Sequence, residues 1–253
     1  MPTQLLVSVK DFGEFELARE VGVTWIDLKD PDQGSLGKPG LPFVRQVHKF
    51  CLDFPARDYK ISLALGELPE LDLDHLEPEV CDFDFVKVAL SGFCPDVDRF
   101  KLYRLSSLLR DPGQLILVHY ADHQVAAAPP FSQVLEMALA LKCRYLLIDT
   151  YRKSAGNLFH WYEPNELDQL IQQARKVGMA VSLAGSLRVE ELQRAAGLQP
   201  DVLAVRGAAC EVGDRKNSLS ERRMVDLVKL ANRNFQQFES NAPSDGDLHL
   251  RIT

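Results

Sequence analysis

The chain has 253 residues, 46% of them hydrophobic, which fits one α/β domain with a sizeable core. Its 36 acidic residues exceed its 29 basic residues, and the formal charge of −7 argues against nucleic acid or anionic lipid as a partner. Five scattered cysteines, an N-terminus without a targeting pattern and no run near the roughly 18 apolar residues of a membrane span predict a cytoplasmic protein without a membrane partner.

Short apolar runs with strand character recur along the chain, and segments with helical spacing lie between them. The runs are 5–9, 24–28, 60–65, 85–90, 114–119, 145–149, 180–184 and 202–205. Alternating strands and helices imply parallel strands joined by right-handed crossovers. Eight such units in a chain of this size predict a single-domain α/β fold, a (β/α)8 TIM barrel; an open doubly wound sheet is the alternative.

Two regions should be less regular than the rest. The third crossover, 69–80, is acidic and contains Pro78, so we expect a short or irregular connection there. The last helix should lie near 221–235 and complete the barrel domain, 1–235. The polar tail 236–253 contains proline and glycine and should fray as a flexible segment.

Two lysines stand in unusual places in this pattern. Lys29 directly follows the second apolar run, and Lys87 lies inside the fourth. Burial disfavours the ammonium form and lowers the pKa of a lysine, so a buried amine can become the neutral nucleophile of imine formation. By position alone, Lys29 fits a Schiff-base lysine or a strand-end residue paired with Asp27 or Asp30. Lys87 fits a general base or a structural ion pair with Asp27 or Asp149.

Polar residues gather at other strand ends, where barrel enzymes carry their chemistry. Asp149 and Lys153 follow the sixth strand and fit a proton-transfer pair, or equally a helix-capping carboxylate and a solvated lysine. Asp27, Tyr120 and Asp122, at the ends of the second and fifth strands, are secondary candidates.

Small residues follow the last two strands. Gly185-Ser186 and Gly207-Ala208 would let backbone N–H groups close around a phosphate, although tight turns alone would also need glycine. Arg206 fits a charge-assisted phosphate contact or a pair with an acidic neighbour. The predicted ligand is a small phosphorylated molecule.

No pattern in the chain calls for a cofactor or a metal. No Gly-x-Gly-x-x-Gly opens a helix, and the glycine-rich segment 34–40 lacks the spacing of a nucleotide-binding P-loop. His119 and His123 straddle a strand end and do not complete a metal site.

The motifs at these strand ends resemble those of the (5-formylfuran-3-yl)methyl phosphate synthases, which make the furan ring of methanofuran. The resemblance runs from about Leu5 to about Leu230. The matching strings are Ile26–Gly37, Phe85–Val88, Tyr120–Asp122, Leu147–Thr150 with Lys153, Leu183–Ser186 and Val205–Cys210. The segments 51–60 and 67–84 are divergent.

The resemblance implies a role for each of four residues. Lys29 would be the Schiff-base lysine and Lys87 the proton acceptor, with Asp149 and Lys153 as supporting acid–base groups. The implied reaction is a cofactor-independent lyase reaction that converts two molecules of glyceraldehyde 3-phosphate into one furan aldehyde phosphate, one inorganic phosphate and two waters.

Two other functions remain open at this point. A class I aldolase acting on another sugar phosphate would share the lysine chemistry and release no inorganic phosphate. A phosphate-binding barrel without catalysis would leave both lysines with ordinary pKa values. Exposed apolar positions on outer helices, including Leu102, Leu105 and Leu108, would allow a homo-oligomer.

Overall fold

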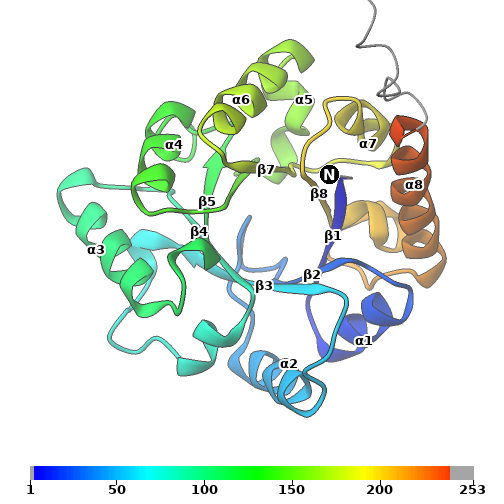
Figure 1. Ribbon diagram of the computed structural model, residues 1–253, viewed down its shortest axis with the longest axis horizontal. Helices are drawn as coiled ribbons and strands as arrows, with labels where there is room; N and C mark the ends of the chain where they lie inside the picture. Colours follow the sequence, from blue (N-terminus) through cyan, green and yellow to red (C-terminus); the bar gives the residue numbers. More distant parts are fainter. Residues whose placement is uncertain (1–2, 240–253) are drawn as a thin grey trace, which may run out of the picture.

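A computed structural model describes residues 3–239, and its centre is a closed barrel of parallel strands in chain order (Figure 1). Pairing between the first and last strands, with Val7 opposite Val205, closes the barrel. The strands are β1 (Gln4–Val9), β2 (Trp25–Leu28), β3 (Lys60–Glu67), β4 (Phe85–Ala89), β5 (Leu115–Tyr120), β6 (Tyr145–Asp149), β7 (Ala180–Leu183) and β8 (Val202–Val205). The predicted (β/α)8 barrel is confirmed, and the open sheet is excluded because no edge is left unpaired.

Helices form a layer around the barrel (Figure 1). They are α1 (Phe12–Glu20), α2 (Leu41–Asp53), α3 (Pro95–Leu108), α4 (Phe131–Ala140), α5 (Leu158–Trp161), α6 (Pro164–Lys176), α7 (Val189–Ala196) and α8 (Glu221–Glu239). Local sequence sets their starts: Asp11 accepts the N–H of Glu14 at 2.9 Å before α1, and proline occupies the first turn of α2, α3 and α6. Within residues 3–239, no helix is both long enough and apolar enough to cross a bilayer.

Of the two regions predicted to be irregular, the structure describes the third crossover in full and the C-terminal tail only in part. Between β3 and β4 the chain forms two short 3-10 turns, η1 (Leu68–Glu70) and η2 (Pro78–Asp82), as expected for the third crossover. Helix α8 continues four residues beyond the predicted boundary at 235 and ends at Glu239. The rest of the tail predicted to be flexible, 240–253, lies outside the described residues.

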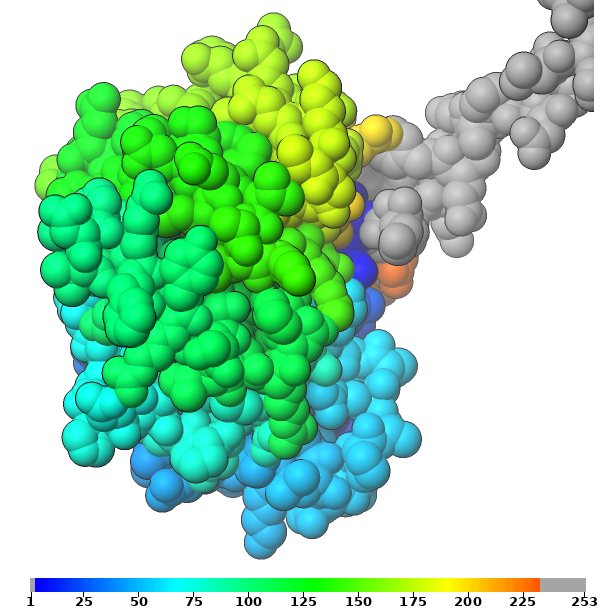
Figure 2. Space-filling model, turned by 60° about the vertical axis from the view of Figure 1, so that its left-hand side comes forward, coloured from blue at the N-terminus to red at the C-terminus, as the bar shows by residue number. Residues whose placement is uncertain are grey.

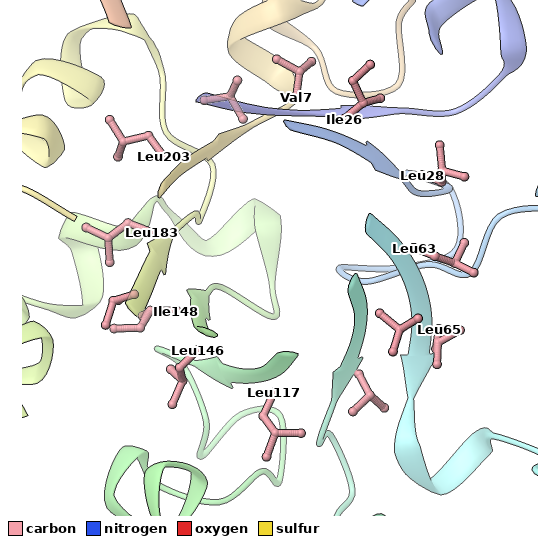
Figure 3. Packing of buried hydrophobic residues seen from close by; sticks show 14 of the residues in the cluster. Val7, Ile26, Leu28, Leu63, Leu65, Leu117, Leu146, Ile148, Leu183 and Leu203 are labelled. Carbon is pink, nitrogen blue, oxygen red and sulfur yellow. The ribbon is translucent and has the colours of Figure 1, made fainter. Parts of the chain in front are cut away.

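Alternate residues of each strand face the helices or the barrel interior. The helix-facing residues are aliphatic and lie outside the ring of strands, as Val7, Leu63 and Leu183 do in Figure 3. Since parallel barrel strands are buried on both faces, the interior-facing residues are buried as well. Apolar side chains fill the amino end of the interior, whereas the carboxyl end holds the buried charges described below.

Aromatic side chains close the amino end of the barrel. Trp25 and Phe85 lie with their ring centres 4.7 Å apart, and Tyr145 packs edge-on 5.1 Å from each. The Lys60 ammonium lies 4.9 Å from the centre of the Trp25 ring, within range of a cation–π interaction. This end of the barrel is therefore packed core.

The outer face of α3 and α4, which comes forward in Figure 2, bears on the predicted oligomer. Leu102 and Leu105, expected to be exposed apolar positions, are buried against the barrel, whereas Leu108 is exposed. The helical period turns these two leucines inward. The other large exposed hydrophobics of α3 are Val97, Phe100 and Tyr103. The homo-oligomer stays a prediction.

Candidate active site

A cavity of about 400 Å³ opens at the carboxyl end of the barrel. Its walls include all four predicted catalytic residues: Lys29, Lys87, Asp149 and Lys153. They also include the five predicted phosphate-binding residues Gly185, Ser186, Arg206, Gly207 and Ala208. Side chains from five different strand ends thus meet in one space, as the active sites of barrel enzymes do.

Lys29 continues β2 by one residue and turns its amine into the barrel. Its backbone N–H donates to the carbonyl of Val9 at 3.0 Å, which fixes the side chain on the interior face. Burial lowers the pKa of this amine to about 7, with smaller contributions from the positive charges of Lys153, Lys87 and Arg215. The Asp149 carboxylate, with Oδ2 4.0 Å from Nζ, acts in the opposite direction. The structure therefore pairs Lys29 across the barrel, and not with the neighbouring Asp27 or Asp30.

Asp149 is a buried carboxylate at the end of β6 that several donors hold in place. Its Oδ1 accepts the N–H of Thr150 at 2.7 Å and a hydrogen bond from the Lys153 ammonium. Burial alone would raise its pKa, but the positive charges of Lys153 and Lys29 outweigh burial and lower it. Burial lowers the pKa of Lys153, although the Asp149 carboxylate acts to raise it. Two partly desolvated amines thus share one carboxylate.

Lys87 forms a second buried pair deeper in the barrel. Its Nζ lies 2.6 Å from Oδ2 of Asp27, a residue that does not line the cavity. The hydroxyls of Ser8 and Ser62 donate to the same carboxylate at 2.9 and 2.7 Å. The structure thus shows the ion pair with Asp27, and Asp27 orients the Lys87 amine, which lines the cavity. The general-base role of Lys87 stays a prediction.

Arg206, predicted to contact a phosphate, lines the cavity but forms its hydrogen bonds within the protein. Its two Nη groups donate to the Glu14 carboxylate at 2.8 and 3.3 Å, and to the carbonyls of Ser8 and Asn217 at 2.9 and 3.1 Å. Its Nε donates to the carbonyl of Arg215 at 2.6 Å. A guanidinium has five N–H donors, and these bonds use all five. Arg206 is therefore paired with the acidic residue Glu14, as the alternative reading of its position allowed, and in this arrangement it has no N–H left for a phosphate.

The loops after β7 and β8 line the cavity with small residues. Gly185 and Ser186 have φ angles of +106° and +53°, and a Cβ at Gly185 would lie 3.1 Å from side-chain atoms of Thr150 and Leu158. Within residues 3–239, the N–H groups of Ser186, Gly207 and Ala208 have no hydrogen-bond acceptor. These donors are available to an anion.

Tyr120 and Asp122 are buried but do not line the cavity. The Tyr120 hydroxyl donates to Glu67 at 2.6 Å. The Asp122 carboxylate accepts the N–H groups of Tyr151 and Arg152 at 2.6 and 2.8 Å, which shapes the loop after β6. Both residues support the site from outside.

Two residues near the site were not among the candidates predicted from the sequence. Ser35, on the loop after β2, lies with its hydroxyl 2.8 Å from the Thr150 carbonyl and 3.4 Å from Asp149. Arg215, beyond η5 (Gly207–Ala209) and η6 (Glu211–Gly213), lines the cavity. Nearby glycines mark both positions in the sequence: Ser35 lies between Gly34 and Gly37, and Arg215 follows Gly213. Neither spacing, however, predicts a contact with another loop.

His119 lies outside the barrel among helix residues. Its Nε2 is 2.9 Å from the Tyr162 hydroxyl, and burial lowers its pKa to about 3. Among residues 3–239, no three His, Cys, Asp or Glu side chains are arranged to hold a metal ion.

A model of the 4-HFC-P synthase family matches residues 5–228. The chain belongs to this family. The resemblance drawn from the strand-end motifs is thereby confirmed.

Two relatives of this family member carry the same synthase name. A (5-formylfuran-3-yl)methyl phosphate synthase of Methanopyrus kandleri is 31% identical over 234 residues, covering 89% of this chain and 97% of the relative. The enzyme of that name from Methanocaldococcus jannaschii is 29% identical, with 89% and 97% covered.

Solved structures share the fold of the 4-HFC-P synthase family member at low identity. Phosphoribosyl anthranilate isomerase of Thermus thermophilus has a TM-score of 0.60 at 14% identity, with 91% of this chain and all of that chain covered. The 3-hexulose-6-phosphate synthase of Salmonella typhimurium has a TM-score of 0.56 at 15% identity, with 90% and 100% covered. These likenesses show the barrel fold alone.

Proposed function

We propose that this protein is a (5-formylfuran-3-yl)methyl phosphate synthase of methanofuran biosynthesis that joins two glyceraldehyde 3-phosphate molecules through an imine on Lys29. Family membership and the names of the relatives support the product. The observation that carries the mechanism is the Lys29 amine, buried in the cavity wall with a pKa lowered to about 7. A large fraction of this amine is neutral near pH 7, as nucleophilic attack on an aldehyde requires.

The reaction begins when the Lys29 amine adds to the aldehyde carbon of one triose phosphate and water leaves. The resulting iminium withdraws electrons, so a base can remove a proton from the adjacent carbon and form an enamine. Lys87 is our candidate for this base, held toward the cavity by Asp27.

The enamine carbon then attacks the aldehyde of the second triose phosphate. Elimination of one phosphate, ring closure with loss of two waters, and hydrolysis of the imine release the furan aldehyde phosphate and return the free amine. Overall, two triose phosphates give one product, one inorganic phosphate and two waters, with no external oxidant or reductant. The Lys153 ammonium donates a hydrogen bond to the Asp149 carboxylate, and this pair is suited to move protons in the elimination and dehydration steps.

The substrate phosphates need donors that the reacting groups do not supply. We assign one phosphate to the free N–H groups of Ser186, Gly207 and Ala208, at the end of the barrel where such anions commonly bind. Phosphate there would leave the triose carbons free to reach Lys29 on the same cavity wall.

The test is intact-protein mass after incubation with glyceraldehyde 3-phosphate and borohydride, with phosphate release measured in parallel. We expect a triose-derived adduct mapped to Lys29 together with phosphate release, and neither in Lys29→Ala. Lys38→Ala, outside the cavity, is the matched control and should keep both signals. An adduct without phosphate release would indicate a class I aldolase, and absence of both signals would indicate a binding protein without this chemistry.

A further inference from the structure

Arg215 differs from the other buried or half-buried cations that line the cavity, and Arg188, which also lines it, is exposed. Lys87 is paired with Asp27, Arg206 with Glu14, and Lys153 with Asp149. Among the described residues, by contrast, no carboxylate forms an ion pair with Arg215. Its positive charge is therefore available to a ligand.

The position of Arg215 is fixed by contacts that leave part of its guanidinium unused. One Nη donates to the carbonyl of Gly34 at 2.9 Å, across the gap between the loops that follow β8 and β2. That bond holds the half-buried side chain over the cavity and uses one of five donors. Burial lowers the pKa of Arg215, but an arginine stays protonated at neutral pH.

Arg215 also lies beside the free backbone donors. A Cβ placed on Gly207 would be 3.8 Å from the backbone nitrogen of Arg215 and 3.9 Å from the Arg215 Cβ. The Gly207 N–H itself has no acceptor within residues 3–239. A fixed cation and unused N–H groups thus share one edge of the cavity, where a dianionic group is favoured over a neutral one.

We propose that Arg215 is the charge-bearing residue of the phosphate site, and that it selects phosphomonoester substrates over their unphosphorylated counterparts. The planar guanidinium can give two parallel hydrogen bonds to phosphate oxygens, while Ser186, Gly207 and Ala208 supply neutral N–H donors. Arg206, nine residues earlier in the chain, forms its hydrogen bonds within the protein and positions the loop. The phosphomonoester specificity rests on the proposed function, whereas anion binding at Arg215 does not.

The first test measures binding of inorganic phosphate to the full chain by calorimetry. We compare the wild type with Arg215→Gln, Arg215→Lys and the control Lys216→Gln. Lys216 is an adjacent cation whose Nζ lies 3.3 Å from Asp32 and which does not line the cavity, so this control also removes one link between the same two loops. We expect Arg215→Gln to weaken binding by about ten- to a hundredfold, Arg215→Lys by less, and Lys216→Gln not measurably.

The second test compares imine trapping with glyceraldehyde 3-phosphate and with glyceraldehyde. In Arg215→Gln the preference for the phosphorylated aldehyde should fall by about the same factor, while trapping of glyceraldehyde stays unchanged. Equal losses with both aldehydes, or unchanged phosphate binding in Arg215→Gln, would overturn the proposal. If phosphate binding depends on Arg215 but no furan product forms, the proposed function fails and the anion site stands.

Discussion

The environment of Lys29 decides most of the chemistry at the scale of single residues. An ordinary lysine of pKa 10.5 would be neutral in about three molecules in ten thousand at pH 7, whereas a pKa of about 7 makes close to half of the amines neutral. Burial is the main cause, and Asp149 limits the effect by favouring the ammonium form. The carboxylate that orients the amine thus also restrains its deprotonation.

The first prediction is the pH dependence of imine formation. Because only the neutral amine attacks, the rate of trapping by cyanoborohydride at fixed triose phosphate should rise about tenfold per pH unit below pH 7 and level off above it. Asp149→Asn should move this inflection to lower pH, because the charge that raises the pKa of Lys29 is removed. A rate that keeps rising to pH 10 would mean that Lys29 titrates as an ordinary lysine.

At the scale of elements, the loop after β8 is held by a buried ion pair. Glu14 of α1 accepts hydrogen bonds from Arg206 and from the N–H groups of Lys10 and Leu219 at 2.9 and 3.1 Å. The loop also folds tightly at Gly207, where a Cβ would lie 3.2 Å from the carbonyl of Gly213. The pair therefore ties the segment that carries Gly207, Ala208 and Arg215 to the barrel.

The second prediction concerns the stability that this pair provides. Arg206→Gln should lower the free energy of unfolding by about 3–5 kcal/mol, because Glu14 is left buried without its partner. Arg45→Gln, at the exposed pair with Glu79, should cost less than about 1 kcal/mol. Urea unfolding followed by tryptophan fluorescence measures both.

The double variant Glu14→Met with Arg206→Met is the control for this prediction. It should recover part of the lost stability, since no unpaired charge stays buried. A loss below 1 kcal/mol in Arg206→Gln would show that the pair is not needed to hold the loop.

At the scale of the whole molecule, the residues that stabilise the fold and the residues of the candidate site lie at opposite ends of the barrel. The amino end is packed with Trp25, Phe85 and Tyr145, whereas the buried charges and the cavity lie at the carboxyl end. Each strand contributes to both ends, because its interior-facing residues run from one to the other. Changes at the amino end should therefore act on folding and leave the site intact.

The third prediction follows from this separation. Phe85→Leu should reduce the free energy of unfolding by about 1–3 kcal/mol, since it removes ring contacts with Trp25 and Tyr145. The rate and pH profile of imine trapping per folded molecule should not change. Phe100→Leu, at an exposed position of α3, should alter stability by no more than about 0.5 kcal/mol. A shifted pH profile in Phe85→Leu would contradict the separation.

The sequence by itself determined the barrel and the positions of most site residues. Each apolar run predicts its own strand from local composition, and parallel strands bring their carboxyl ends to one edge. Lys29, Lys87, Asp149 and Lys153 could therefore be assigned to one cavity from their place after or within strands.

Only the tertiary structure decided which side chains pair. Asp149 and not a neighbouring carboxylate lies beside Lys29, and Glu14, 192 residues away, uses the donors of Arg206. Ser35 reaches the carbonyl of Thr150 from 115 residues away, and Arg215 lines the cavity without an ion pair to any residue in 3–239. The physical reason is that hydrogen bonds and ion pairs act over a few ångströms, and closure of the barrel, not spacing along the chain, sets those distances.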